Sequence, residues 1–232
     1  DKKAEIKNLT LTGKLNITEN YRNSYAYSGG LVGAAEYVSF TDVTTDITVT
    51  AKQGTAPYPW SYVGGFAGTV KNADFLRCVN NGSVTSDGDY VSGFVPKSET
   101  TTYTACANNG AVTARTKVGG FGAEVKSTKA TDCGNTGAIS LVEYGTGKQA
   151  IGGLFAEIRY GSALTRCYNT GAVTGDCYVG GLVGSVGSSS DATNGPSYIV
   201  DSYNSGAITG HSDKYYCGIG GLVGKLDASS SR

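Results

Sequence analysis

A short glycine step recurs seven times along this 232-residue chain. Each copy sets Gly-Gly or Ser-Gly inside a short apolar stretch, as in Val-Gly-Gly-Phe-Ala-Gly at 63–68 and Ile-Gly-Gly-Leu-Val-Gly at 219–224. The steps begin at residues 29, 64, 92, 119, 152, 180 and 220, so successive copies lie 27 to 40 residues apart. Self-similarity at such a period indicates an array of stacked structural units, and most short motifs here therefore belong to the scaffold.

A second recurring block lies between the glycine steps. Its clear copies read Cys-x-Asn-x-Gly, followed by a small residue and a Val/Ile-Thr/Ser pair, and they begin at Cys78, Cys106, Cys133 and Cys167, with a Ser202 version after them. The two blocks alternate from end to end without a break in composition. We therefore expect one repeat domain over residues 1–226 and a polar tail at 227–232 that links to a longer protein.

Each repeat has the local chemistry of a strand, a turn and a second strand. Val, Thr, Tyr and Gly dominate the composition, and β-branched pairs flank the Asn-x-Gly centres, which we expect to hold backbone of positive φ. No segment keeps a 3.6-residue apolar period, so we expect essentially no helix. The sequence predicts an all-β, single-domain β-solenoid of about seven coils, in which equivalent strands stack on one another.

Insertions concentrate at one corner of the predicted coil. The stretch from a glycine step to the next Cys-type position is 12 to 15 residues in five of six repeats, whereas the stretch from that position to the following glycine step ranges from 13 to 23. Insertions confined to one face of a solenoid often mark its binding face. We therefore expect function at the corner just upstream of the glycine steps.

Aromatic residues gather at this corner, and Tyr and Trp are enriched at binding surfaces because they join a large apolar face to a polar tip. The predicted aromatic edge consists of Tyr25, Tyr27, Tyr58, Trp60, Tyr62, Tyr90, Tyr144, Tyr178, Tyr215 and Tyr216. Those that stand two residues before a glycine step are Tyr27, Tyr62, Tyr90 and Tyr178. For this subset a structural stack along the coil edge is an equally good interpretation. The loop 52–60, which has no equivalent in other repeats, favours binding.

The cysteines fall into two groups. Cys-x-x-Cys pairs, which zinc sites use, are absent, so we expect no metal site. Cys177 and Cys217 each precede a glycine step by three residues in successive repeats, so a disulfide between them is one alternative, although the unequal loops before the two steps argue against strict alignment. Residues that share one repeat position, and that we expect to form a ladder of small buried hydrophobes, are Cys78, Cys106, Cys133 and Cys167.

Charge and motif content exclude several function classes. The 19 basic and 19 acidic residues cancel, so we expect no nucleic-acid partner. No apolar run approaches the roughly 20 residues that span a bilayer, so we expect no direct membrane insertion. The lone His211 lies in a polar loop, and a nucleophile elbow and a phosphate loop are absent. We expect no enzymatic activity and no cofactor; Arg166 and Asp201 are expected to form an ordinary cross-coil ion pair.

The pairing of Gly-Gly-Leu-Val-Gly with Cys-Tyr-Asn-Thr-Gly-Ala-Val-Thr resembles the GLUG-motif repeat family of bacterial surface adhesins, which also occurs near the N-termini of some IgA-cleaving metallopeptidases. The resemblance covers nearly the whole chain and is strongest over 63–224. It implies an extracellular region of a secreted or cell-surface bacterial protein and carries no catalytic residues. We expect an adhesin-like domain whose aromatic edge binds a glycan or protein on a host or neighbouring cell; a passive stalk and a polysaccharide-cleaving β-helix are the alternatives.

Overall fold

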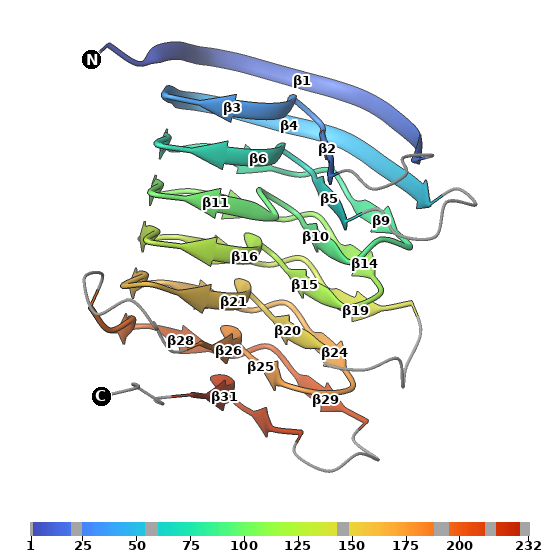
Figure 1. Cartoon of the computed structure of the whole chain (residues 1–232), viewed down its shortest axis with the longest axis vertical. Helices are drawn as coiled ribbons and strands as arrows, with labels where there is room; N and C mark the ends of the chain where they lie inside the picture. Colours follow the sequence, from blue (N-terminus) through green and yellow to red (C-terminus); the bar gives the residue numbers. More distant parts are fainter. Residues whose placement is uncertain are drawn as a thin grey trace.

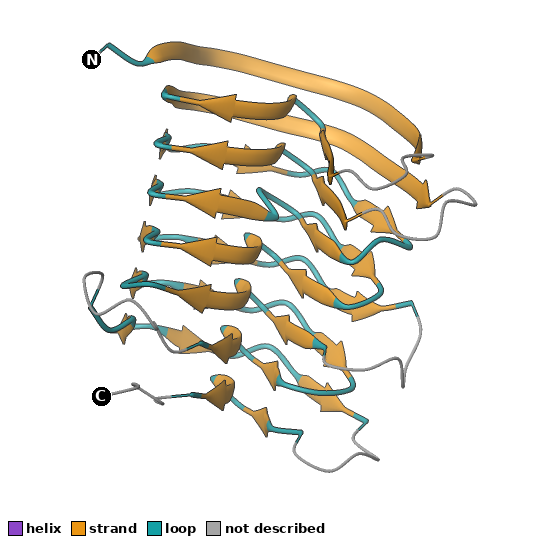
Figure 2. Cartoon of the chain, in the orientation of Figure 1, coloured by secondary structure: helices purple, strands orange, loops and turns teal. Residues whose placement is uncertain are grey.

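The computed structural model describes residues 2–19, 25–53, 60–142, 149–187, 195–211 and 217–227. Every regular element in these ranges is a β-strand, as Figure 2 shows. The chain winds through coils stacked along the long axis of the molecule, from the N-terminal end at the top of Figure 1 to the C-terminal end at the bottom. Strands of successive coils pair in parallel. The predicted all-β solenoid is therefore confirmed.

One side of every coil belongs to a single large sheet, which we call sheet A. It begins with two long strands, β1 (Ala4–Glu19) and β4 (Val38–Gln53), which pair with each other over nearly their whole length. Three short strands per coil continue it: β7 (Asp74–Leu76), β8 (Val79–Asn80), β9 (Val84–Ser86), β12 (Thr102–Thr104), β13 (Ala107–Asn108), β14 (Val112–Ala114), β17 (Lys129–Thr131), β18 (Gly134–Asn135), β19 (Ile139–Leu141), β22 (Ala163–Thr165), β23 (Tyr168–Asn169), β24 (Val173–Gly175), β27 (Tyr198–Val200), β28 (Tyr203–Asn204) and β29 (Ile208–Gly210).

The other side of every coil is divided between two sheets, each with seven strands in the described part of the chain (Figure 1). Sheet B consists of β2 (Tyr25–Gly29), β5 (Trp60–Gly64), β10 (Tyr90–Ser92), β15 (Lys117–Gly119), β20 (Ala150–Gly152), β25 (Val179–Gly180) and β30 (Ile219–Gly220). Sheet C consists of β3 (Val32–Glu36), β6 (Ala67–Lys71), β11 (Lys97–Glu99), β16 (Gly122–Lys126), β21 (Phe155–Arg159), β26 (Val183–Val186) and β31 (Val223–Leu226). The glycine step of each repeat is the bend between sheets B and C.

The two repeated blocks of the sequence face each other across the interior of the coil. Asn135 is fully buried, and its Nδ2 donates hydrogen bonds to the Gly137 carbonyl at 2.8 Å and to Asn169 Oδ1 in the next coil at 2.7 Å. A Cβ on Gly120, the second glycine of the facing step, would lie 2.5 Å from Asn135 Oδ1 and 2.4 Å from the Gly153 carbonyl oxygen. The glycine step therefore has no side chain because the amide ladder and the next coil occupy that space.

The amide ladder separates two apolar columns. Beside sheet C, aromatic rings stack from coil to coil, with centroid distances of 4.8 Å for Phe66–Phe94 and 4.9 Å for Phe94–Phe121. Beside sheet B, the column is aliphatic and consists mainly of Val, Ile and Ala side chains such as Val91 and Ile151, neither of which is exposed. Burial of each such side chain contributes roughly 1.5–3 kcal/mol, so these two columns hold the coils together.

The prediction that the Asn-x-Gly centres hold backbone of positive φ is wrong. None of the clear copies has a positive φ at its Asn or Gly. Left-handed backbone instead falls mainly at two bends of the coil. One is the residue before the Cys position, with φ of 51° at Arg77 and 54° at Asp132, where sheet A bends between its first and second short strands. The other follows most sheet C strands, with φ of 51° at Asn72 and 48° at Ser127. The glycine of each Asn-x-Gly centre is required instead for the close approach of successive coils. A Cβ on Gly110 would lie 1.9 Å from the Gly82 carbonyl oxygen of the preceding coil.

The expected ion pair between Arg166 and Asp201 is also wrong. Arg166 instead forms two hydrogen bonds to Asp132 in the preceding coil, with Nε–Oδ1 and Nη2–Oδ2 distances of 2.7 and 2.9 Å. Arg77 pairs with Asp42 in the same way. Arg166 lies between Asp132 and Asp201, which occupy the same repeat position in the preceding and following coils. Its guanidinium can form paired hydrogen bonds with only one of these two carboxylates. These pairs are exposed, so they contribute little to stability.

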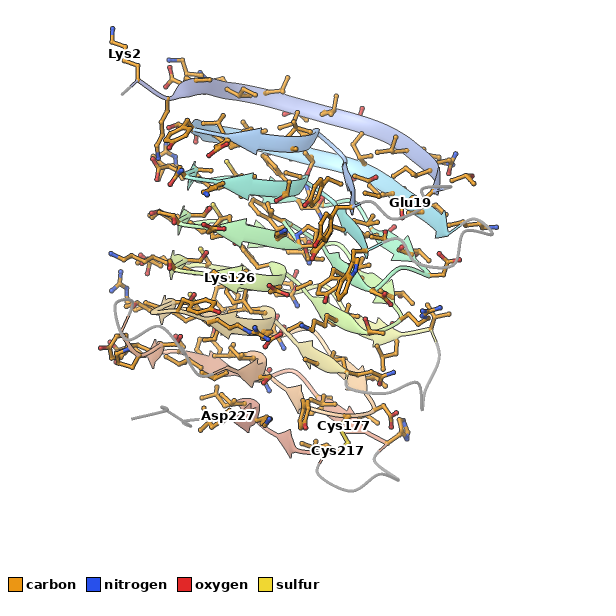
Figure 3. All side chains as sticks on the ribbon, viewed as in Figure 1. Lys2, Glu19, Lys126, Cys177, Cys217 and Asp227 are labelled. Atoms are coloured by element: carbon orange, nitrogen blue, oxygen red, sulfur yellow. A yellow bond between two sulfur atoms is a disulfide. The ribbon has the colours of Figure 1, made fainter. Side chains whose placement is uncertain are left out.

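The cysteines occupy two settings. Cys177 and Cys217 form a disulfide between successive coils, with their Cα atoms 4.8 Å apart (Figure 3). The four free cysteines are all buried, and their thiols stack from coil to coil. The backbone amide of Cys78 donates a hydrogen bond to Cys106 Sγ at 3.4 Å. Burial raises the pKa of the Cys133 thiol well above its ordinary value. All four side chains pack within the apolar column beside sheet C, so this ladder belongs to the core.

Candidate functional site

The outer face of sheet B carries aromatic side chains at the N-terminal end of the solenoid. Strand β2 contributes Tyr25 and Tyr27, β5 contributes Trp60 and Tyr62, and β10 contributes Tyr90. Alternate residues of a strand share one face, and the intervening residues of these strands enter the interior. Parallel pairing sets Tyr27 beside Tyr62 and Tyr62 beside Tyr90. We call these five residues the aromatic strip.

The rings of the aromatic strip are in contact with one another. Centroid distances are 4.6 Å for Tyr62–Tyr90, 5.4 Å for Tyr27–Tyr62 and 5.5 Å for Trp60–Tyr90. All three lie in the 4.5–7 Å range of favourable aromatic pairs. The strip is therefore a continuous packed layer, in which each ring restricts the rotamers of its neighbours.

Exposure divides the strip into a base and a top. Tyr62 and Tyr90 are only 4% and 7% exposed, whereas Tyr25 and Trp60 are 58% and 51% exposed. Burial raises the pKa of both Tyr62 and Tyr90 above the ordinary value, and the nearby charge of Glu124 raises each further. The base therefore stays protonated, and the top presents two large rings to solvent.

A lysine from sheet C reaches across the bend to the strip. Lys97 Nζ lies 5.2 Å from the ring centroid of Tyr25, 5.5 Å from that of Tyr27 and 5.0 Å from that of Tyr62. It also donates a hydrogen bond to Tyr27 Oη at 3.3 Å. A cation within about 6 Å of an aromatic face is attracted by the ring quadrupole, so Lys97 adds a positive charge to the surface of the strip.

Ion pairs replace the aromatic strip towards the C-terminal end. Lys117 occupies the position next to Tyr90 in sheet B, and its Nζ lies 2.5 Å from Glu157 Oε2 and 3.7 Å from Glu124 Oε2. Lys126, labelled in Figure 3, lies 3.0 Å from Glu124 Oε1. Burial acts to raise the pKa of Glu124, but Lys126 and Lys117 outweigh it and hold the pKa below its ordinary value. Glu124 is therefore charged, and both carboxylates are already paired.

The remaining predicted aromatic residues do not join the strip. Tyr178 shares its column, but Lys117 and Ala150 separate it from Tyr90. Its ring instead faces Lys225, whose Nζ lies 5.1 Å from the centroid. The predicted residues that fall outside the described part of the chain are Tyr58, Tyr144, Tyr215 and Tyr216.

Sequence reasoning missed the charged residues beside the strip. Lys97, Glu124 and Glu157 each stand five residues after the start of a glycine step, so they share one repeat position on sheet C. Lys117 stands two residues before its step, which is the position of the strip tyrosines. The repeat alignment could have found both columns, but it could not show that they face each other.

The described residues offer no metal centre, since no cluster of three or more His, Cys, Asp or Glu side chains is suitably placed among them. Nor does any helix of the described chain have the length and apolar character to cross a membrane. No protein-family model and no curated protein sequence matches the chain. The geometry of the aromatic strip is therefore the main guide to function.

Proposed function

We propose that this chain is a non-enzymatic, adhesin-like repeat domain of a secreted or cell-surface bacterial protein, and that it binds a glycan through the aromatic strip. The observation that carries the proposal is the placement of Trp60 and Tyr25, both more than half exposed, on a base of buried tyrosines. The resemblance of the repeats to the GLUG-motif family supports the bacterial, extracellular setting.

The stacking of sugar rings on aromatic faces requires rings that are exposed and held in place. Tyr25 and Trp60 are register partners on adjacent strands, so their backbones lie about 4.8 Å apart. Tyr62 and Tyr90 pack beneath them and limit their motion. Because the surface is ordered before binding, a ligand loses less conformational entropy on association.

The test is a glycan array followed by calorimetric titration of the best ligand. We expect Trp60→Ala to weaken binding by about tenfold or more, as for a central aromatic contact, and Tyr25→Ala to weaken it to a lesser extent. Tyr203→Ala is the matched control, because Tyr203 is 55% exposed and stacks on Tyr168 on sheet A. Its affinity should equal that of the wild type.

Two results would contradict the proposal. If the Trp60 variant binds as tightly as the control variant, the ligand contacts another surface. If the domain binds no glycan but binds a protein, it is a protein adhesin. If it binds neither, it is a passive stalk. Cleavage of any uronate polymer by the purified domain would instead favour the enzymatic alternative.

A further inference from the structure

Lys97 differs from the other basic residues of the described chain. The basic side chains that are at least partly buried there are Lys3, Lys97, Arg115, Lys117, Lys126, Arg159 and Lys225. All of them except Lys97 form an ion pair with a carboxylate in the described structure. Within the described residues, the Lys97 ammonium lies against three tyrosine rings and donates to the Tyr27 hydroxyl, and it forms no ion pair with Glu124, its register partner. A partly desolvated ammonium without a counter-charge is costly, which makes it a ready partner for an anion.

The position of Lys97 suits a ligand that stacks on the exposed rings. Its ammonium lies over the ring of Tyr25, which is itself 58% exposed and paired in register with Trp60. Beside it, a shallow hollow on β3 and β6 is lined by residues that include Ala34 and Thr69, and Thr69 is the register partner of Lys97. A ring on Tyr25 and Trp60 could therefore place an acidic substituent at Lys97.

The nearby carboxylates do not neutralise this position. Glu124 is paired with Lys126 and Lys117, and Glu99 is paired with Lys71 at 3.3 Å. Glu36 lines the hollow on β3 and β6 together with Lys71. The buried base of the strip contributes no charge, because burial raises the pKa of Tyr62 and Tyr90 and keeps both protonated. Lys97 thus places an unpaired positive group over the exposed ring of Tyr25.

We propose that the aromatic strip selects acidic glycans, with a sugar ring on Tyr25 and Trp60 and the sugar carboxylate on Lys97. This inference rests on the proposed glycan-binding function and names its ligand class. A charge-assisted hydrogen bond of this kind corresponds to a preference of roughly tenfold or more for the acidic sugar over its neutral counterpart.

The single tryptophan of the chain lies in the strip, so its fluorescence reports binding directly. Two matched probe pairs are titrated: sialyllactose against lactose, and trigalacturonate against its carboxyl-reduced form. We expect tighter binding of the acidic member of at least one pair, weakened by salt. Lys97→Gln should remove the preference for the acidic sugar, and Lys97→Arg should keep it. Lys129→Gln is the control, because Lys129 is an exposed lysine on sheet A.

The outcomes separate this inference from the function on which it rests. Equal binding of acidic and neutral sugars, or a preference that survives in the Lys97→Gln variant, overturns the acidic ligand class but leaves glycan binding in place. Absence of a fluorescence change with all four sugars, together with a blank glycan array, overturns both. Circular dichroism of each variant shows whether a lost signal reflects a lost fold.

Discussion

Replacement of Asn135 by Asp tests the amide ladder with almost no change in shape. The Asn135 side chain donates to the Gly137 carbonyl and to Asn169 Oδ1, and its Oδ1 accepts from Asn108 Nδ2 at 2.7 Å. An aspartate keeps the acceptor but loses both donated hydrogen bonds. It also sets a negative carboxylate against two buried acceptor oxygens.

The magnitude follows from these three contacts. Each buried acceptor left without a donor costs about 1–3 kcal/mol, and an uncompensated buried charge costs about 3–5 kcal/mol. We therefore expect Asn135→Asp to lose at least about 3–5 kcal/mol near neutral pH, a lower bound set by the buried charge alone. The native state favours a protonated aspartic acid, which can still donate one hydrogen bond, so the folded pKa lies above the unfolded value of about 3.9. The loss should be smallest below about pH 4 and should grow as pH rises through the folded pKa.

Urea unfolding at acidic and neutral pH measures the effect, and hydrogen exchange at the ladder shows whether the central coils open locally, as repeat arrays can. Asn109→Asp is the control, because Asn109 is the next residue after a ladder asparagine and its side chain is exposed, with Nδ2 bonded to Asn81 at 2.9 Å. It should cost less than about 1 kcal/mol. The reasoning fails if the buried variant is no less stable than the control, or if its loss does not depend on pH.

Two further predictions concern the ends of the solenoid. Glu19, labelled in Figure 3, is buried, and burial raises its pKa although the hydroxyls of Ser28 and Ser61 oppose this. Because the pKa of Glu19 is raised in the folded state, the stability of the wild type should fall as pH rises from below about 4.5 through the folded pKa. The melting temperature of the Glu19→Gln variant should therefore change less between acidic and neutral pH than that of the wild type. A variant with the same pH dependence as the wild type contradicts this. The Cys177–Cys217 disulfide closes a loop of 40 residues, which corresponds to a stabilisation of about 4 kcal/mol from loop-closure entropy. Reduction of this disulfide should increase hydrogen exchange in the last coils only. An increase that is uniform across the chain would show that the disulfide does not stabilise the last coils locally.

Stacking along the solenoid axis could be predicted from the sequence alone. Residues at equivalent repeat positions lie above one another because parallel strands of successive coils pair in register, as Asn108 does with Asn135. That rule was enough to predict the all-β solenoid and the column that contains Cys106 and Cys133. It also set Tyr27, Tyr62 and Tyr90 in one row, since each stands two residues before a glycine step.

Contacts across the coil could not be predicted in this way. The repeat period says nothing about the angle at which sheets B and C meet, and this angle brings Lys97 to Tyr25 and Lys117 to Glu157. The position of the left-handed backbone was also missed, because the residue type there varies from Arg77 and Ala105 to Asp132 and forms no recurring turn motif. Their conformation is imposed by the bend of sheet A and not by local preference.

The sequence by itself therefore determined the order of residues along the axis of this protein, because parallel pairing turns a repeat into a column. Only the tertiary structure decided which columns meet and which side chains stay exposed. Tyr62 and Trp60 belong to the same strand and differ little in chemistry, yet one is 4% and the other 51% exposed. That difference depends on packing against neighbouring coils and on the bend at the glycine step, and it leaves Trp60 but not Tyr62 accessible at the surface.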